Sequence, residues 1–173
     1  MSHPKNARTK VSLIIFGDQV IPDEWALYFQ RSPDEWAFRD EPVVGDRHFR
    51  GPRIATETFA AYISANPRRV TIDQQVTALK EILQFPRPDF STRILSADVS
   101  VRLTIDVDNY RGDNPPIYGA PTERFLAETG AILDLQIFDQ DSLARSEHAE
   151  SEQSPDYQRT LASLTIRGDH VVP

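Results

Sequence analysis

The chain has 173 residues, a net charge of −7 at pH 7 and no cysteine. This length suits one well-buried core better than two, and the acidic balance disfavours both nucleic acid and membranes as partners. Because disulfides, thiolate nucleophiles and cysteine-ligated metals are all excluded, the composition fits a reducing compartment, and we expect a cytoplasmic protein.

The amino-terminal part of the chain predicts a strand followed by a helix. Residues 1–10 are polar and are expected to form a disordered tail, whereas the apolar residues 11–16 are typical of a buried strand. Pro22 suits the first turn of a helix, where its missing N–H costs nothing. The inner face of this helix is expected to hold aromatic residues at helical spacing, namely Trp25, Tyr28 and Phe29.

The next part of the chain predicts a loop, a strand and a capped helix. Residues 40–53 combine proline, glycine and dense charge, which favours a loop, and residues 56–64 favour a strand. Thr71 and Gln74 have the spacing of a capping box, in which each side chain accepts the other residue's backbone N–H. The helix that follows is predicted from an apolar stripe, formed by Ile72, Val76, Leu79, Ile82 and Leu83.

Residues 95–107 carry the clearest pattern in the sequence. Apolar residues occupy every odd position from Leu95 to Val107, and polar residues occupy the positions between them. Because side chains on a strand alternate between two faces, this pattern predicts one long strand with a dry face and a wet face. The dry face must be covered, so the pattern also predicts helices packed against it.

The last part of the chain predicts a short helix, a strand and a polar tail. Thr122 is expected to cap the helix and Gly130 to end it. The next strand is predicted from the alternation of Leu133, Leu135 and Ile137. Residues 139–156 have the composition of a solvated linker or a mobile loop. A weaker apolar pattern, formed by Leu161, Leu164 and Ile166, predicts an edge strand.

These elements together predict an α+β fold. We expect a single, mostly antiparallel sheet with two or three helices packed on one face, ferredoxin-like in outline. The expected parts of the chain are the tail at residues 1–10, one domain at residues 11–138, and a polar linker with an edge strand at residues 139–173.

Two segments also carry a family resemblance. The first combines a strand ending in Phe16-Gly17-Asp18 with an acidic proline-led turn, Pro22-Asp23-Glu24, and a later Ser32-Pro33. The second, residues 125–137, is a helical stretch followed by Gly130-Ala131 and an alternating strand. Over about residues 11–138 the chain resembles the mainly bacterial domain of unknown function 4279 family. The resemblance implies an α+β fold, and the family brings no established activity or catalytic residues.

The sequence predicts no catalytic residues and no cofactor. Its four histidines lie in polar stretches, and it contains neither a Gly-x-Ser-x-Gly elbow nor a glycine-rich phosphate loop. A metal site would have to use carboxylates, and Asp98, Asp106 and Asp108 are weak candidates because they share the expected wet face of the long strand. The alternative is a solvated polar face without a metal.

The loop at residues 40–53 is the first candidate for a partner-binding site. Three arginines lie close together in it and flank a histidine and a phenylalanine, and arginine at this density can grip a carboxylate or a phosphate. The alternative is a solvated loop whose arginines are balanced by nearby acids. The candidate residues are Arg47, His48, Phe49, Arg50 and Arg53, together with Trp36.

Three functions fit the sequence. The first is a non-catalytic binding module with a protein partner, such as an immunity or other interaction protein, either as a monomer or as a homodimer. The second is a small-ligand-binding protein or a hydrolytic enzyme, with its site on the polar sheet face or in the loop at residues 40–53. The third is a structural subunit of a larger assembly, in which residues 161–166 add a strand to a neighbouring sheet.

Overall fold

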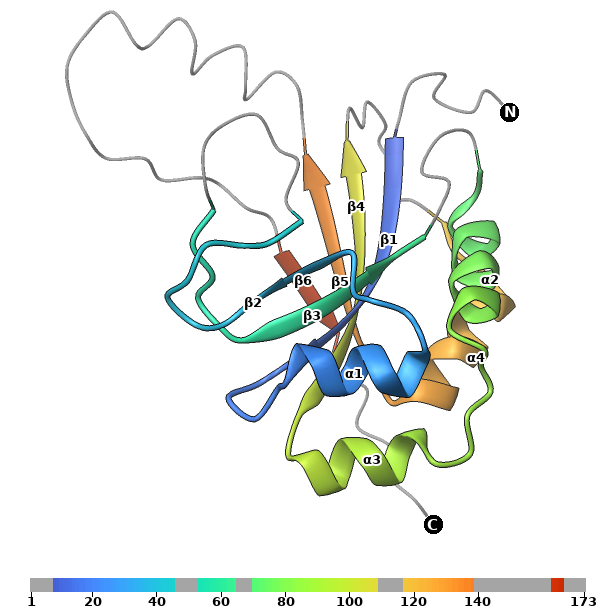
Figure 1. Ribbon diagram of the computed structural model, residues 1–173. Coiled ribbons are helices and arrows are strands. Elements are labelled where there is room, and N and C mark those ends of the chain that lie inside the picture. Colours follow the sequence, from blue (N-terminus) through green and yellow to red (C-terminus); the bar gives the residue numbers. More distant parts are fainter. Residues whose placement is uncertain (1–7, 46–52, 65–69, 109–116, 139–162, 167–173) are drawn as a thin grey trace, which may run out of the picture.

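The computed structural model describes residues 8–45, 53–64, 70–108, 117–138 and 163–166. They form one six-stranded mixed sheet whose spatial order is β2-β3-β1-β4-β5-β6 (Figure 1). The strands are β1 (Arg8–Phe16), β2 (Glu35–Ala37), β3 (Phe59–Ile63), β4 (Ser100–Asp108), β5 (Ile132–Phe138) and β6 (Ser163–Ile166).

The sheet is antiparallel except at one pair of neighbours. β1 lies in the middle and runs antiparallel to β3 on one side and to β4 on the other. β2 pairs with β3, and β6 pairs with β5, both antiparallel. β5 runs parallel to β4, because the connection between them crosses over through a helix. β2 and β3 cross β4 and β5 steeply in Figure 1, so the sheet is strongly twisted.

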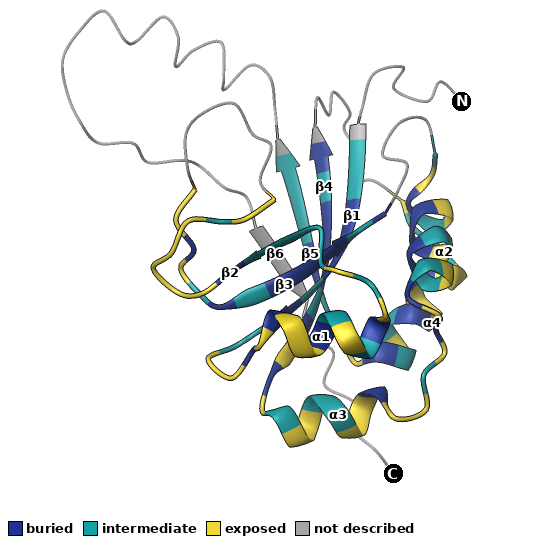
Figure 2. Cartoon of the chain, viewed as in Figure 1, coloured by how far each residue is buried: buried dark blue, intermediate teal, exposed yellow. Residues whose placement is uncertain are grey.

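Four helices contribute to one hydrophobic core against the dry face of the sheet. They are α1 (Pro22–Phe29), α2 (Ile72–Ile82), α3 (Phe90–Ala97) and α4 (Ala120–Thr129). Their inward residues meet the odd-numbered residues of β1 and β4, and Figure 2 shows these inner surfaces buried while the outer turns of α1 and α3 are exposed. No described helix is long and apolar enough to cross a membrane.

Several local predictions are confirmed. Pro22 is the first residue of α1, and Gly130 ends α4 in the left-handed conformation. Thr71 and Gln74 form the predicted capping box at the start of α2. β1 begins at Arg8, inside the expected tail, because the length of β4 provides cross-strand partners as far as the Arg8–Asp108 pair.

The prediction of one long strand over residues 95–107 is wrong at its start. Residues up to Ala97 belong to α3, and the side chain of Leu95 is exposed, with a relative accessibility of 81%. Phe90, Ile94 and Ala97 recur at helical spacing and pack on the core, so a helical pattern overlaps the alternating one. Asp98, in the left-handed conformation, ends α3, and the odd positions from Val99 onward are buried as predicted.

Thr122 does not cap α4 as predicted. Gly119 is the N-cap residue, and Asp73 of α2 supplies the missing acceptor from outside the helix. The Asp73 carboxylate accepts the Gly119 N–H at 3.0 Å and the Thr122 hydroxyl at 2.6 Å. Burial would raise the pKa of Asp73, but the hydrogen bonds from Thr122 and Gly119 outweigh it and lower this pKa. The contact joins α2 to α4.

The chain therefore has an α+β fold with a single mixed sheet. Its described residues form four helices, whereas the sequence predicts two or three, because the alternating pattern hides α3. The ferredoxin-like outline stays a prediction, because β4 and β5 run parallel.

Candidate functional site

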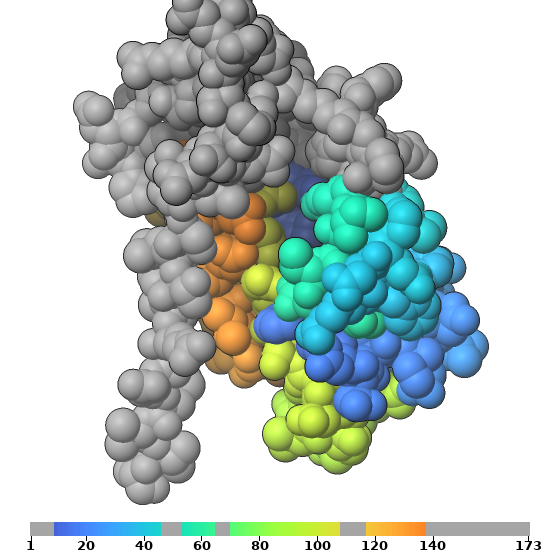
Figure 3. Space-filling model, turned by 90° about the vertical axis from the view of Figure 1, so that its left-hand side faces the viewer, coloured from blue at the N-terminus to red at the C-terminus, as the bar shows by residue number. Residues whose placement is uncertain are grey.

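A pocket of about 420 Å³ lies on the polar face of the sheet, opposite the helices. Figure 3 looks at this side of the molecule, where β5 (orange) and the β2–β3 region (cyan to green) flank β4 and β1. Residues of β1, β2, β3, β4 and β5 line the pocket, together with residues 53–57 of the chain that leads into β3. The site is therefore assembled from segments far apart in the sequence.

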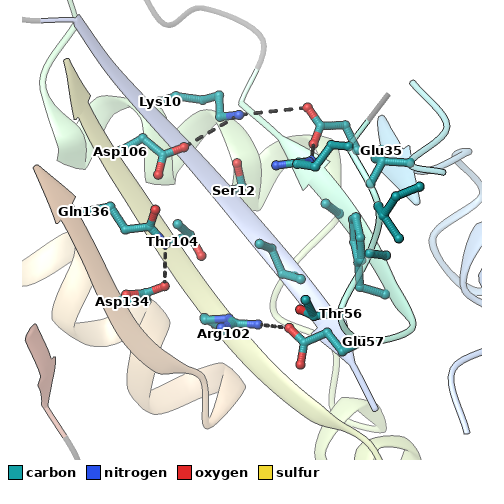
Figure 4. A pocket seen from close by; sticks show the side chains of 17 residues that line it. Lys10, Ser12, Glu35, Thr56, Glu57, Arg102, Thr104, Asp106, Asp134 and Gln136 are labelled. Atoms are coloured by element: carbon teal, nitrogen blue, oxygen red, sulfur yellow. Dashed lines mark hydrogen bonds and ion pairs between the residues drawn. The ribbon is translucent and has the colours of Figure 1, made fainter. Parts of the chain in front are cut away.

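The strand register explains which polar side chains meet there. Even-numbered residues of β1, β4 and β5 point away from the helices, and the pairing aligns them in rows across the sheet. One row consists of Lys10, Asp106 and Gln136, and the next consists of Ser12, Thr104 and Asp134. Figure 4 shows these rows on one side of the pocket.

The opposite wall is built by the chain between β2 and β3. The Val43 N–H donates to the Arg53 carbonyl at 2.8 Å, and the Ala55 N–H donates to the Glu41 carbonyl at 3.0 Å, so the two ends of this connection are held side by side. They present an apolar surface to the pocket, to which Val43, Ile54, Ala55, Phe59 and Ala61 contribute. This apolar wall also carries Glu35, Arg53 and Glu57, whereas β1, β4 and β5 supply the other charged side chains of the described lining.

Each cation that lines the pocket is paired with an acid. Glu35, whose side chain is mostly buried, accepts a hydrogen bond from Arg53 Nη2 at 2.9 Å and lies 3.9 Å from Lys10 Nζ. Lys10 also approaches Asp106, at 3.6 Å. At the other end of the pocket, Arg102 pairs with Glu57. These ion pairs hold the charged side chains of the pocket in place.

Within the described part of the chain, three buried polar atoms of the lining residues have no hydrogen-bond partner. They are Thr104 Oγ1, Asp134 Oδ1 and Arg102 Nε. The residues Thr104 and Asp134 retain relative accessibilities of only 5% and 6%. The other oxygen of Asp134, Oδ2, accepts a hydrogen bond from Gln136 Nε2 at 2.9 Å. Buried polar atoms are nearly always paired in folded proteins, so three such atoms at one pocket need an explanation, for which a water, an ion or a ligand are candidates. Four other such atoms of the described residues lie outside the pocket, on Arg31, Tyr62, Arg87 and Arg93.

The structure brings two of the predicted site residues into this pocket, Arg53 and Asp106. Trp36 lies beside them on β2, half-buried, with its ring centroid 5.9 Å from that of Phe38. The remaining partner-binding candidates lie outside the described residues, namely Arg47, His48, Phe49 and Arg50.

The predicted carboxylate face does not hold together as a metal site. Asp98 ends α3 and is not on the strand, which separates it from Asp106. Asp108 is the last residue of β4, and its side chain is not among those described. Among the described residues, no group of three or more histidine, cysteine, aspartate or glutamate side chains is placed to hold a metal ion. The wet face is also not uniformly wet, since Thr104 is buried.

Sequence reasoning missed most of the residues that form the pocket. Lys10 was assigned to the tail, and Glu35, Thr104 and Asp134 were not singled out. The only local signal was a polar residue at an even position of an alternating strand, which is also typical of a solvated face. Burial of Thr104 and Asp134 depends on the strand pairing and on the apolar wall, neither of which is local.

Comparisons with family models, with curated proteins and with solved structures found no match to this chain.

Proposed function

We propose that the chain is a small-ligand-binding protein and that the pocket on the polar sheet face is its binding site. The observation that carries this proposal is the gathering of Thr104 Oγ1, Asp134 Oδ1 and Arg102 Nε, all without partners, at a single pocket. Each such buried atom costs about 1–3 kcal/mol if it stays unpaired. A ligand that supplies the missing hydrogen bonds recovers that cost, which makes the pocket a favourable binding site.

The dimensions and chemistry of the pocket support the same conclusion. Sites for small molecules typically enclose roughly 300–1,000 Å³ and combine apolar walls with a few fixed polar groups. The pocket has a volume of about 420 Å³ and combines apolar residues on the β2–β3 side with fixed ion pairs, Lys10–Asp106 on β1 and β4 and Arg53–Glu35 on the β2–β3 side. Three of the four carboxylates in the described lining, Glu35, Glu57 and Asp106, are held in ion pairs, which favours binding over acid–base hydrolysis by paired carboxylates.

The interaction-module function stays a prediction. Four of its six candidate residues lie outside the described part of the chain, and Arg53 is engaged by Glu35. The resemblance to the domain of unknown function 4279 family and the cytoplasmic location likewise stay predictions.

A titration followed by two-dimensional amide NMR tests the proposal. The protein is mixed separately with an amine, a carboxylate, a neutral sugar and a phosphate monoester, each raised to millimolar concentration. We expect at least one class to cause saturable shifts centred on the amides of Ser12, Thr104 and Asp134, which lie side by side on β1, β4 and β5. Shifts confined to other surfaces, or none with any class, would contradict the proposal.

A further inference from the structure

Asp134 differs from the other carboxylates of the pocket in its partners. Glu35, Glu57 and Asp106 each pair with a lysine or an arginine. Among the described residues, Asp134 has only the Gln136 amide as a partner, and its Oδ1 has none. An almost fully buried carboxylate with one bare oxygen is costly unless a positive charge or a donor reaches it.

From this geometry we infer that the ligand is a small organic amine, and that its ammonium group binds Asp134. The inference deepens the proposed function and rests on it. An ammonium carries three N–H donors. One meets Asp134 Oδ1, and a second meets the hydroxyl of Thr104, which is aligned with Asp134 on the neighbouring strand.

The charges of the pocket favour a cation over an anion. Among the described residues that line it, four are carboxylates and three are basic, so carboxylates are in excess in this part of the lining. An anionic ligand could accept from Arg102 Nε, but it would face the bare oxygen of Asp134 and three further carboxylates of the described lining. An ammonium supplies the missing partner of Asp134 and breaks none of the ion pairs, whereas Arg102 Nε, itself a donor, gains no partner from it.

An organic cation fits the pocket better than a metal ion does. Calcium and magnesium need about six or more oxygen ligands, whereas the described side chains provide no cluster of three carboxylates or imidazoles. The apolar wall, which includes Ile54 and Phe59, and Ile14 of β1 favour an apolar body on the ligand instead. The expected ligand is therefore an ammonium group carried on a short aliphatic or aromatic body.

Access to Asp134 requires a small movement of one side chain. Asp134 Oδ1 is shielded from water, and the Gln136 amide donates to the neighbouring oxygen of the same carboxylate (Figure 4). Gln136 is half-buried and lies on the pocket face of β5, and rotation of its side chain would free Oδ2 of the same carboxylate. In the complex the ammonium takes the place of the Gln136 amide or joins it.

Calorimetric titration with three matched probes tests the inference. Phenethylamine carries the expected ammonium, phenylpropionate carries a carboxylate, and phenethyl alcohol is neutral. We expect phenethylamine to bind at least ~10-fold more tightly than either analogue, which corresponds to one partly desolvated ion pair. A preference for phenylpropionate would overturn the inference, and so would equal binding of all three probes.

Three variants test whether Asp134 causes the preference for phenethylamine over its neutral and anionic analogues. Asp134→Asn keeps the shape and removes the charge, and we expect it to weaken phenethylamine binding about tenfold and to abolish the preference over the alcohol. Thr104→Val should weaken binding by about threefold, because one hydrogen bond is lost. The matched control is Asp18→Asn, which removes a carboxylate that Arg39 engages outside the pocket, and it should change the affinity by no more than about twofold.

The outcomes separate the inference from the proposed function. If Asp134→Asn folds, as judged by circular dichroism, and binds phenethylamine as the parent protein does, the amine assignment is wrong. If Asp134→Asn does not fold, unchanged phenethylamine affinity in Thr104→Val overturns the assignment instead. If another chemical class binds at the pocket in the NMR titration while amines do not, the inference fails and the proposed function stands. If no class binds, both fail.

Discussion

Replacing Thr104 by valine should make the unliganded protein more stable. The Thr104 side chain is buried and its hydroxyl has no hydrogen-bond partner. An unpaired buried hydroxyl costs about 1–3 kcal/mol. Valine has the same branched shape and the same preference for strands, so it removes this cost without opening a cavity. We expect the free energy of unfolding to rise by about 1–2 kcal/mol, which corresponds to roughly 2–8 °C in Tm.

The matched control is Thr58→Val. Thr58 is also buried, at a relative accessibility of 6%, but its Oγ1 accepts the Arg39 N–H at 3.0 Å. The same substitution at this position should lower the free energy of unfolding by about 1 kcal/mol, because it removes a hydrogen bond and leaves a donor unpaired. Both variants are compared with the parent protein by urea unfolding and by calorimetry. If Thr104→Val is destabilised as much as Thr58→Val, then the hydroxyl of Thr104 has a partner, and the reasoning about the pocket is refuted.

Four further predictions concern the fold that supports the pocket. Asp73→Ala should lower the free energy of unfolding by about 1–2 kcal/mol at neutral pH. Because hydrogen bonding lowers the pKa of Asp73, the difference in stability from the parent protein should shrink as the pH falls through this lowered pKa. A difference that stays constant when stability is measured down to acid pH would argue against the contact. Thr71→Ala should lower the free energy of unfolding by about 1 kcal/mol in urea, through loss of the capping box, and an unchanged midpoint would exclude that role. Gln75→Leu should lower the free energy of unfolding by about 2–3 kcal/mol, because the buried amide forms hydrogen bonds with both β1 and the chain after β3. The Val11 amide hydrogen should then exchange faster with solvent, and slower exchange would contradict this role. Val101→Asp should cost about 3–5 kcal/mol, since it places an unpaired anion in the core, and a parental Tm would contradict the assignment of the dry face.

The sequence predicts the dry side of the sheet well because that side depends on local alternation. Val101, Leu103 and Ile105 are buried at the positions that the pattern indicates. The same pattern hides α3, since Ala97 satisfies both the helical and the alternating period, whereas Ile94 satisfies only the helical one. Local patterns therefore predict which residues are apolar and inward more reliably than they predict where an element begins.

The pocket could not be predicted in the same way. Thr104 and Asp134 become neighbours only because β5 pairs in parallel with β4, after a crossover through α4. The apolar wall forms only because the ends of the β2–β3 connection are held together by backbone hydrogen bonds such as that from Val43 to Arg53. Neither pairing leaves a signal in the spacing of residues along the chain. Polar residues on a strand are also more often solvated than buried.

A crystal structure of the protein grown with saturating phenethylamine tests the central claim most directly. The account predicts the ligand in the pocket on the polar sheet face, with its nitrogen within hydrogen-bond distance of Asp134 and Thr104 and its ring against the wall formed by Ile54 and Phe59. An empty pocket with both side chains paired to other protein groups would contradict it.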